Sequence, residues 1–247
     1  MIRASLGKLR RKLHALAYRR LAILECDAPI VTFTFDDFPK NAGTAGAAIV
    51  EAFGGRATYY TAMGLCGTDN RLGEQFNLYD LFSLAERGHE IGNHTFSHIS
   101  ARRYPFAKFI EDIRRCESEF RKERIPGWTQ NFAYPYGEVS LMKKGRLGSL
   151  MKSCRGTQPG WNGPAVDLNL LRANALYGGI ESRQAACDLL RENARRKGWL
   201  IFYTHDVCEM PSPYGCTPEL LEQVARCAAE SGHQSMPVDR VVNTFLT

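Results

Sequence analysis

Histidine and aspartate side chains, the residue types that bind metals and transfer protons, occur where strand-like runs of this sequence end. His94 and His98 are separated by three residues, so on a helical turn both imidazoles would face one side, as two ligands of one metal. Asp36 and Asp37 follow the run TFTF and add carboxylates. Two histidines, one aspartate and an open position are typical of catalytic zinc, and the second aspartate could act as a base toward water. The alternatives are a structural histidine pair and an acidic helix cap with a solvated neighbour.

Two further runs end in groups that complete a hydrolytic site. His205 follows LIFYT, the most apolar strand-like run. A core histidine bonded to a backbone carbonyl is the usual alternative, but beside a metal site it can supply a leaving-group proton as general acid. The turn Pro135-Tyr136-Gly137 exposes amide hydrogens that can stabilise an oxyanion. Tyr134, Trp161 and Tyr203 are candidates for a sugar-binding wall, although aromatic residues more often belong to a core.

The elements that must position these groups alternate between strands and helices. We expect strands over 29–35, 56–62, 89–94, 130–134, 151–155, 171–176, 199–204 and 235–239. We expect helices over 42–53, 77–87, 105–123, 182–197 and 218–231, the last one capped by Thr217, with a short helix closing the chain. This alternation is typical of a parallel sheet, open or closed into a barrel. The carboxyl ends of its strands form one face, where the polar clusters would converge.

Composition limits the remaining choices. The 247 residues are 44% hydrophobic and 23% charged, which suits one soluble domain, and no apolar run approaches the roughly 20 residues of a membrane-spanning helix. The basic N-terminus is not followed by an apolar signal-peptide core, so we expect a cytoplasmic protein. Most of the eight cysteines are then expected to be free thiols or small core residues, with Cys208 and Cys216 able to bridge only if the protein were exported.

The first 24 residues carry seven Lys or Arg and no acid, whereas the rest of the chain holds 25 of the 32 basic residues against 26 acidic ones. Such a local charge argues against a general nucleic-acid surface. An apolar stripe in this segment predicts an amphipathic helix over 1–26 preceding a domain over 27–247. The helix would pack on its own barrel or on a second subunit of a homo-oligomer. The alternative is peripheral contact of 1–24 with anionic lipid at the inner membrane face.

Three motifs together resemble the polysaccharide deacetylases, the carbohydrate esterases of family four that share the rhizobial chitooligosaccharide-deacetylase homology domain. They are Thr34-Phe35-Asp36-Asp37, the run GHEIGNHTFSH over 88–98, and FAYPYG over 132–137. The resemblance spans about residues 29–240 and implies a distorted (β/α) barrel of about seven parallel strands. It also implies one divalent metal, usually Zn²⁺, with Co²⁺, Ni²⁺ or Mn²⁺ as alternatives.

Carried over by position, the resemblance implies a role for each polar cluster. Asp36 is the base, and Asp37, His94 and His98 are the metal ligands. The amide of Tyr136 helps to hold the oxyanion, and His205 protonates the departing sugar amine. As substrate-binding residues we predict Tyr134, Pro135, Trp161, Arg172 and Tyr203.

Departures from the family pattern concern the neighbours of the base and the acid. Many relatives have an arginine at the position of Ala133 that positions the base, and here Arg172 or Arg155 could supply the cation instead. Tyr203 replaces a leucine that lines the acetyl pocket. The acid that tunes the catalytic histidine has two candidates, Asp167 and Asp206.

The leading hypothesis is therefore metal-dependent hydrolysis of a carbon–nitrogen bond other than a peptide bond. The substrate would be an N-acetylated sugar in a glycan, oligosaccharide or glycolipid precursor. One alternative is hydrolysis of a cyclic amide or ureide on the same barrel. Another is a non-catalytic sugar-binding relative, against which the full set of ligands, base and acid stands.

Overall fold

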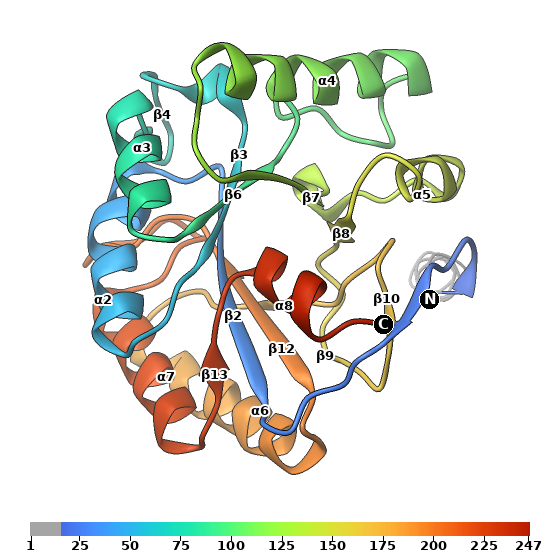
Figure 1. Ribbon diagram of the computed structural model, residues 1–247. Coiled ribbons are helices and arrows are strands. Elements are labelled where there is room, and N and C mark those ends of the chain that lie inside the picture. The colour runs from blue at the N-terminus through green and yellow to red at the C-terminus, as the bar shows by residue number, and fades with distance from the viewer. Residues whose placement is uncertain (1–15) are drawn as a thin grey trace, which may run out of the picture.

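The central element of the computed structural model, which describes residues 16–247, is a curled sheet of seven parallel strands (Figure 1). In spatial order the strands are β11 (Asn174–Ala175), β12 (Trp199–Thr204), β2 (Ile30–Asp36), β3 (Thr58–Thr61), β6 (Glu90–Asn93), β7 (Trp128–Ala133) and β8 (Ser153–Arg155). The curl brings the two edges toward each other, and a parallel bridge pairs Arg155 with Leu171. This half-barrel confirms the predicted α/β fold with seven parallel strands.

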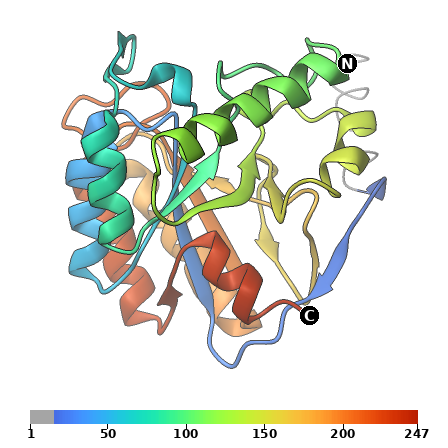
Figure 2. The same ribbon diagram turned by 45° about the horizontal axis from the view of Figure 1, so that its top comes forward.

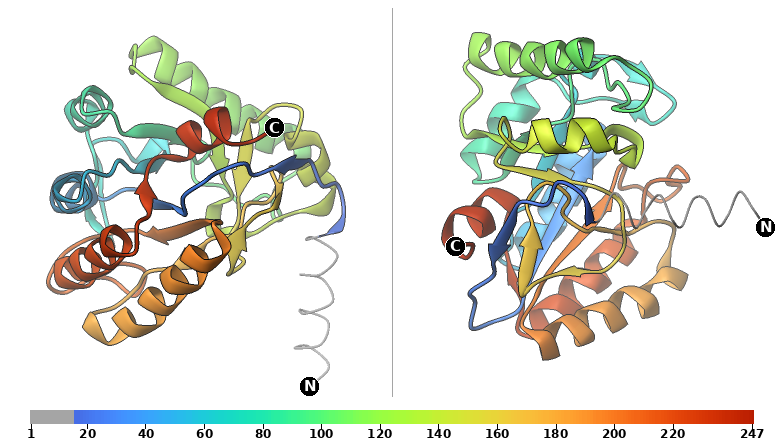
Figure 3. Two further views of the ribbon diagram at one scale, coloured as in Figure 1. Left: turned by 60° about the horizontal axis from the view of Figure 1, so that its bottom comes forward. Right: turned by 90° about the vertical axis from the view of Figure 1, so that its right-hand side faces the viewer.

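Helices cover the outer face of the sheet (Figure 2). They are α2 (Ala47–Ala52), which continues a π-helical turn over Ala42–Gly46, α3 (Leu78–Glu86), α4 (Phe106–Lys122), α5 (Leu141–Leu147), α6 (Arg183–Arg196), α7 (Pro218–Glu230) and α8 (Val238–Thr244). Helices α6 and α7 lie side by side (Figure 3). Thr217 caps α7 as predicted, because its side chain accepts a hydrogen bond from the amide of Leu220 at 3.2 Å.

Short strands surround this frame. β1 (Leu21–Ile23) pairs antiparallel with β10 (Ala165–Asp167), and β4 (Asp69–Asn70) forms a hairpin with β5 (Gly73–Glu74). β9 (Trp161–Asn162) pairs with β12, and β13 (Gln234–Ser235) pairs with β2.

Some local predictions differ from the structure. The N-terminal helix predicted over 1–26 lies outside the described residues up to residue 15, and β1 shows that the segment is a strand by residue 21. The last strand, expected over 235–239, ends at Ser235, and helix α8 begins at Val238. Helix α5 and the β4–β5 hairpin were not predicted.

The alternation of strand side chains explains why reactive groups face the barrel interior. In β2, Val31, Phe33 and Phe35 pack against the helices, whereas Thr32 and Thr34 point inward. The inward hydroxyls are satisfied by the carbonyls of Met236 and Phe202, at 2.8 and 2.9 Å. Because side chains alternate with period two, the next inward residue at the carboxyl end of the strand is Asp36.

Strand β12 follows the same rule. Leu200 and Phe202 join the core under the helices, whereas Trp199, Ile201 and Tyr203 pack in the inner cluster. The polar groups that follow each strand therefore gather at one end of the barrel, as expected for parallel strands.

Two further predictions concern the whole chain. All eight cysteines lie in the described part of the chain and are free thiols there, as predicted. None of the helices described between residues 16 and 247 has the length and apolar character needed to cross a membrane.

Candidate active site

The carboxyl ends of the strands open on a cavity of about 360 Å³. It collects seven of the predicted site residues: Asp36, Asp37, His94, His98, Tyr136, Tyr203 and His205. Gly137, which follows in the third motif, lines it as well. These eight residues come from four separate parts of the sequence.

Asp37, His94 and His98 form a cluster with the geometry of a metal site. The Nε2 atoms of His98 and His94 lie 3.1 and 3.7 Å from Oδ1 of Asp37. Ligand atoms of all three residues lie within 4.8 Å of one another, and Asp37 and His94 are buried. One carboxylate oxygen and two imidazole nitrogens are donors that suit Zn²⁺ and its neighbours in the first transition series.

Asp37 provides the test of whether a cation fits. Its Oδ1 atom is buried and has no hydrogen-bond partner within residues 16–247. An unpaired buried carboxylate oxygen is costly, and a cation between it and the two imidazoles would remove that cost. The residues present therefore fit a divalent metal.

The protonation of the histidines also suits a cation. The Nδ1 atom of His94 lies 2.8 Å from the carbonyl of Ala133, which can only accept, so Nδ1 carries the hydrogen and Nε2 keeps its lone pair. Burial lowers the pKa of His94 to about 3 and that of His98 to about 4, so both rings are neutral near pH 7. Burial also raises the pKa of Asp37 to about 6, with His205 opposing and Asp36 adding to the rise.

The two histidines converge by a different route from the predicted one. Residues 94–100 form no helical turn; Thr95 and His98 instead have left-handed backbones, with φ of 62° and 50°. Oδ1 of Asn93 accepts the amide of Thr95 at 2.8 Å, and the hydroxyl of Thr95 accepts the amide of Ile99 at 3.0 Å. These bonds fold the loop so that the two imidazole centroids are 4.9 Å apart.

Asp36 is held by an arginine that crosses the barrel. Nη2 of Arg155 lies 2.5 Å from Oδ2 of Asp36 and also contacts Oδ1, and both residues are buried. Burial raises the pKa of Asp36, but the guanidinium of Arg155, together with His94 and His205, outweighs this effect and holds the pKa below its ordinary value. The carboxylate is therefore ionised in a site that would otherwise favour its protonated form.

Of the two arginines proposed to replace the one missing at Ala133, the structure brings Arg155 to Asp36. Its guanidinium lies between the rings of Tyr60 and Tyr203, 5.1 Å from each centroid. Arg172 lies elsewhere and donates from Nη1 to the carbonyl of Pro159 at 3.0 Å.

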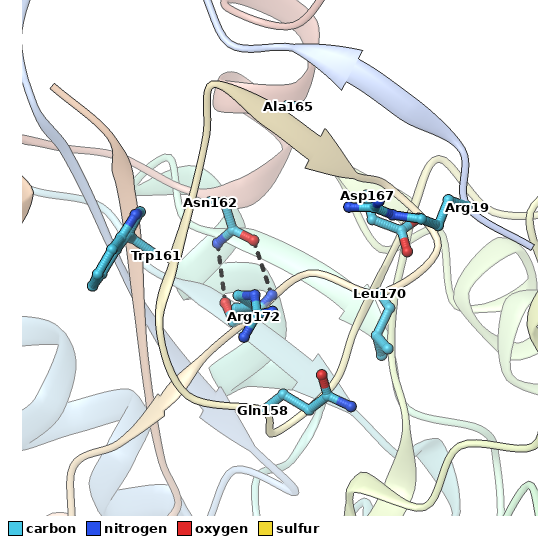
Figure 4. A pocket seen from close by; sticks show the side chains of 8 residues that line it. All are labelled: Arg19, Gln158, Trp161, Asn162, Ala165, Asp167, Leu170 and Arg172. Carbon is cyan, nitrogen blue, oxygen red and sulfur yellow. Dashed lines mark hydrogen bonds between the residues drawn. The ribbon is translucent and has the colours of Figure 1, made fainter. Parts of the chain in front are cut away.

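Trp161 and Arg172 line a second, smaller hollow of about 50 Å³ instead of the main cavity (Figure 4). In this hollow the side chain of Asn162 bonds to the backbone of Arg172, which fixes the local chain. Arg196 covers the Trp161 ring at 4.1 Å. Neither residue forms part of the cavity wall that was predicted for it.

Two other predicted substrate-binding residues also lie off the cavity. Tyr134 is buried and packs edge-on against Phe132, with ring centroids 5.2 Å apart. Its position on β7's outward side explains this placement, because side chains alternate across the sheet. Pro135 is buried in the turn. Tyr203 does line the cavity.

His205 presents one ring nitrogen to the cavity. Its Nδ1 lies 3.2 Å from the carbonyl of Tyr214, so this nitrogen is the donor and Nε2 has no partner among the described residues. Neither acid proposed to tune this histidine bonds to it. Asp206 accepts from the amide and hydroxyl of Ser212, and Asp167 pairs with Lys144 at 2.7 Å.

The turn after β7 offers a free amide at the cavity. Tyr136 has a left-handed backbone with φ of 60°, and within residues 16–247 its N–H makes no hydrogen bond. Gly137 also has φ of 60°, and a Cβ there would lie 2.1 Å from the Oγ1 of Thr157. Close packing against Thr157 therefore fixes the turn that exposes the amide.

Comparison with known proteins identifies the family of this chain. Residues 25–147 match the sequence profile of the family described as polysaccharide deacetylase. The chain belongs to the polysaccharide deacetylase family. No curated protein matches its sequence.

Solved structures of deacetylases share this fold. A chitin deacetylase from the fungal pathogen Colletotrichum lindemuthianum is 17% identical, with 91% of this chain and 94% of that chain covered and a TM-score of 0.56. A family 4 carbohydrate esterase from Streptomyces lividans is 18% identical, with 85% of this chain and 92% of that chain covered and a TM-score of 0.54. The peptidoglycan deacetylase PdaC from Bacillus subtilis is 17% identical, with 88% of this chain and 91% of that chain covered and a TM-score of 0.51.

Several residues of the cavity wall were missed by reasoning from the family motifs. They are Arg71, Leu72, Thr157, Tyr177 and Tyr214. All lie on loops or short hairpins outside the three motifs, so no periodicity or spacing marked them. The signal that was available is position, since Tyr177 follows a predicted strand and Thr157 follows another.

Proposed function

We propose that this polysaccharide deacetylase family member is a metal-dependent hydrolase that removes an N-acetyl group from a sugar. The substrate class is an N-acetylated glycan, oligosaccharide or glycolipid precursor, and the metal is one divalent ion, with Zn²⁺ as first candidate. The observation that carries the proposal is the unpaired buried Oδ1 of Asp37 facing two neutral imidazoles, directly beside the ionised carboxylate of Asp36.

The chain's own residues supply the proton transfers. When bound, a divalent ion would act as a Lewis acid and lower the pKa of water to about 7. Asp36, kept ionised by Arg155, accepts the proton of the water that attacks the acetamido carbonyl. The N–H of Tyr136 donates to the oxygen on which negative charge develops.

His205 completes the reaction. Hydrolysis breaks the carbon–nitrogen bond and yields acetate and an amine, and the departing nitrogen must gain a proton. The carbonyl of Tyr214 holds the imidazole through its Nδ1–H, so in the imidazolium form the second proton sits on Nε2, and Nε2 gives it to the departing nitrogen. Base and acid thus come from β2 and β12, which are neighbours in the sheet.

The alternative substrate, a cyclic amide or ureide, has one observation in its favour. Tyr203 and Tyr177 pack edge to face with centroids 5.5 Å apart in the cavity wall, where family members often have a leucine. A flat ring could pack against such a wall. The same catalytic groups would serve this reaction, so only the substrate separates the two proposals.

The deciding experiment is acetate release from a panel of N-acetylated sugars by protein loaded with zinc or cobalt. The Asp36→Asn variant is the matched control, because it keeps the shape of the base and removes its charge. Release by the wild type that is lost in the variant and on chelation supports the proposal. Metal-bound protein that opens cyclic amides and leaves every sugar intact would transfer the proposal to the alternative.

For the basic segment over 1–24 we retain two alternatives, packing on the barrel or a second subunit and peripheral contact with anionic lipid. Each basic residue close to an anionic bilayer adds about 1 kcal/mol, so the five that precede residue 16 should give measurable binding at low salt. Co-sedimentation with anionic vesicles, repeated with neutral ones, tests this contact. No binding to anionic vesicles would leave packing on the barrel or on a second subunit.

A further inference from the structure

One cation of the cavity wall is not used by the proposed chemistry. Arg71 lies at the tip of the β4–β5 hairpin, and its side chain lines the cavity. Its guanidinium stands 5.8 Å from the ring centroid of Tyr214. It forms no ion pair or hydrogen bond with any residue in the described part of the chain, 16–247.

The hairpin that carries Arg71 is fixed to the chain just after Asp37. Lys40 pairs with Glu74 at 2.6 Å, and Pro39 bridges to Gln75. The backbone N–H of Gln75 donates to the carbonyl of Thr68 at 2.9 Å, which ties the base of the hairpin together. The guanidinium is therefore presented to the cavity by an anchored element.

Charges around the cavity leave Arg71 without a protein partner. Asp36 is paired with Arg155, and Asp37 faces the two histidines. At the rim beside Tyr136, Arg103 lies 5.9 Å from the ring of that tyrosine but has Glu138 at 3.5 Å. Among the described residues, Arg71 is thus the cavity-lining arginine whose guanidinium N–H groups are free to bind a ligand.

The place of Arg71 indicates which part of the substrate it would meet. Tyr214, against which it stands, has its ring 5.7 Å from that of His205, and its carbonyl orients the same imidazole. His205 protonates the departing sugar amine in the proposed reaction. Arg71 therefore stands beside the group that would protonate the sugar nitrogen, and it is close enough to Asp37 and His98 to lower the pKa of both.

We propose that Arg71 binds an anionic substituent of the sugar, so that the substrate is an acidic N-acetylated sugar bearing a carboxylate or a phosphate. This inference rests on the proposed deacetylase function and deepens it. Planar guanidinium groups bind either oxyanion through two parallel hydrogen bonds, which gives both affinity and orientation. The charge would fix the sugar with its acetamido group toward Asp36 and the metal ligands.

The test compares N-acetylhexosaminides that differ only in one substituent, a hydroxyl, a carboxymethyl ether or a phosphate, placed in turn at each free position. Wild type, Arg71→Gln, Arg71→Lys and the rim control Arg103→Gln are assayed for kcat/KM on each compound. We expect the wild type to prefer an anionic member by roughly tenfold to a hundredfold, the range of a charge-assisted hydrogen bond. Arg71→Gln should lose this preference and keep its activity on the neutral sugar within about threefold.

The two controls separate contact from long-range charge. Arg71→Lys keeps the charge without the planar fork and should retain only part of the preference, whereas Arg103→Gln should retain all of it. Carboxylate and phosphate members of the panel distinguish the two sources of the anion. Equal rates on neutral and anionic sugars in the wild type, or an equal loss on both in Arg71→Gln, would overturn the inference.

A second readout keeps this inference separate from the deacetylase proposal. Calorimetric binding of the corresponding amino sugars, which need no turnover, is measured for wild type and Arg71→Gln. Tighter binding of the anionic amino sugars that disappears in the variant supports the role of Arg71 even if no sugar is deacetylated. Binding that does not depend on the anion overturns it even if neutral sugars are good substrates.

Discussion

Arg155 and Asp36 meet across the interior of the barrel, although their strands are not neighbours. Strands β3, β6 and β7 separate β8 from β2 in the sheet, and the curl of the sheet brings the guanidinium to both carboxylate oxygens. In family members with an arginine on the preceding strand, the cation approaches the base from the third motif. Here the same carboxylate is held from the following strand.

Replacing Arg155 with methionine should inactivate the enzyme and destabilise it. Asp36 would then be a buried carboxylate without its cation, which costs about 3–5 kcal/mol of unfolding free energy. Burial would raise the pKa of Asp36, so the acidic limb of the kcat/KM profile should move to higher pH. At pH 7 we expect a loss of roughly a hundredfold, which recovers in part as the pH rises.

The matched control for this prediction is Arg172→Met, which removes an arginine that does not reach the base. Arg155→Lys should recover part of the rate because it restores the charge. An acidic limb that stays in place in Arg155→Met would show that Arg155 has only a structural role.

Removal of single ligands should abolish metal binding without unfolding the protein. Asp37→Ala and His98→Ala each delete one of three donors, and we expect the bound divalent ion to be lost on gel filtration. Metal content measured by mass spectrometry, together with circular dichroism, checks this outcome. His89→Gln is the control, because His89 belongs to the same motif but bonds to Glu51 at 2.7 Å and should keep the ion.

Metal affinity should depend on pH through Asp37. Protons compete with the cation for this carboxylate below its pKa of about 6, whereas His94 and His98, with pKa values of about 3 and 4, are already neutral there. The logarithm of the affinity should therefore rise with a slope of about one up to pH 6 and then level off. Competition with a chromogenic chelator measures this curve. A slope of about two that continues to pH 6.5 would show that both histidines titrate as free imidazoles.

Gly137→Ala should lower kcat/KM more than an alanine at another glycine with the same positive φ does. Gly127 has nearly the same φ, 62° against 60°, but a Cβ there would meet nothing within 4 Å. Both alanine variants should lose about 1 kcal/mol of stability from the positive φ alone, and Gly137→Ala should lose more because its Cβ displaces Thr157. Only Gly137→Ala forces Thr157 away from the cavity, and we expect its kcat/KM to fall about tenfold. Equal rates in the two variants would argue against a role for this turn.

The sequence alone was sufficient to predict the fold and to identify the polar groups at the ends of the strands. Strand β12 was predicted with its observed bounds, 199–204, because the run WLIFYT is rich in apolar, aromatic and β-branched residues and starts after a glycine. The convergence of Asp36, His94 and His205 followed from parallel strands alone. These predictions depended on local patterns that the tertiary structure preserves.

The remaining features depend on tertiary contacts. His94 and His98 were expected on a helical turn, whereas bonds from Asn93 and Thr95 fold a loop there, and spacing alone does not separate the two. Trp161 and Arg172 were placed in the substrate wall because of their residue types, but their loop turns toward another hollow. The tip of a short hairpin, such as Arg71, carries no periodic signal that assigns it to a cavity.

The boundary of the family match at residue 147 divides the site itself. The proposed metal ligands and Asp36 precede it, whereas Arg155, Tyr203 and His205 follow it. Substitutions in the later part can retune the strength of the base, the shape of the acyl pocket and the proton donor without touching a ligand. The proposed metal ligands and the acyl-pocket wall are thus encoded in successive stretches of the chain, and a library confined to residues after 147 would explore new acyl groups while the ligands and Arg71 stay constant.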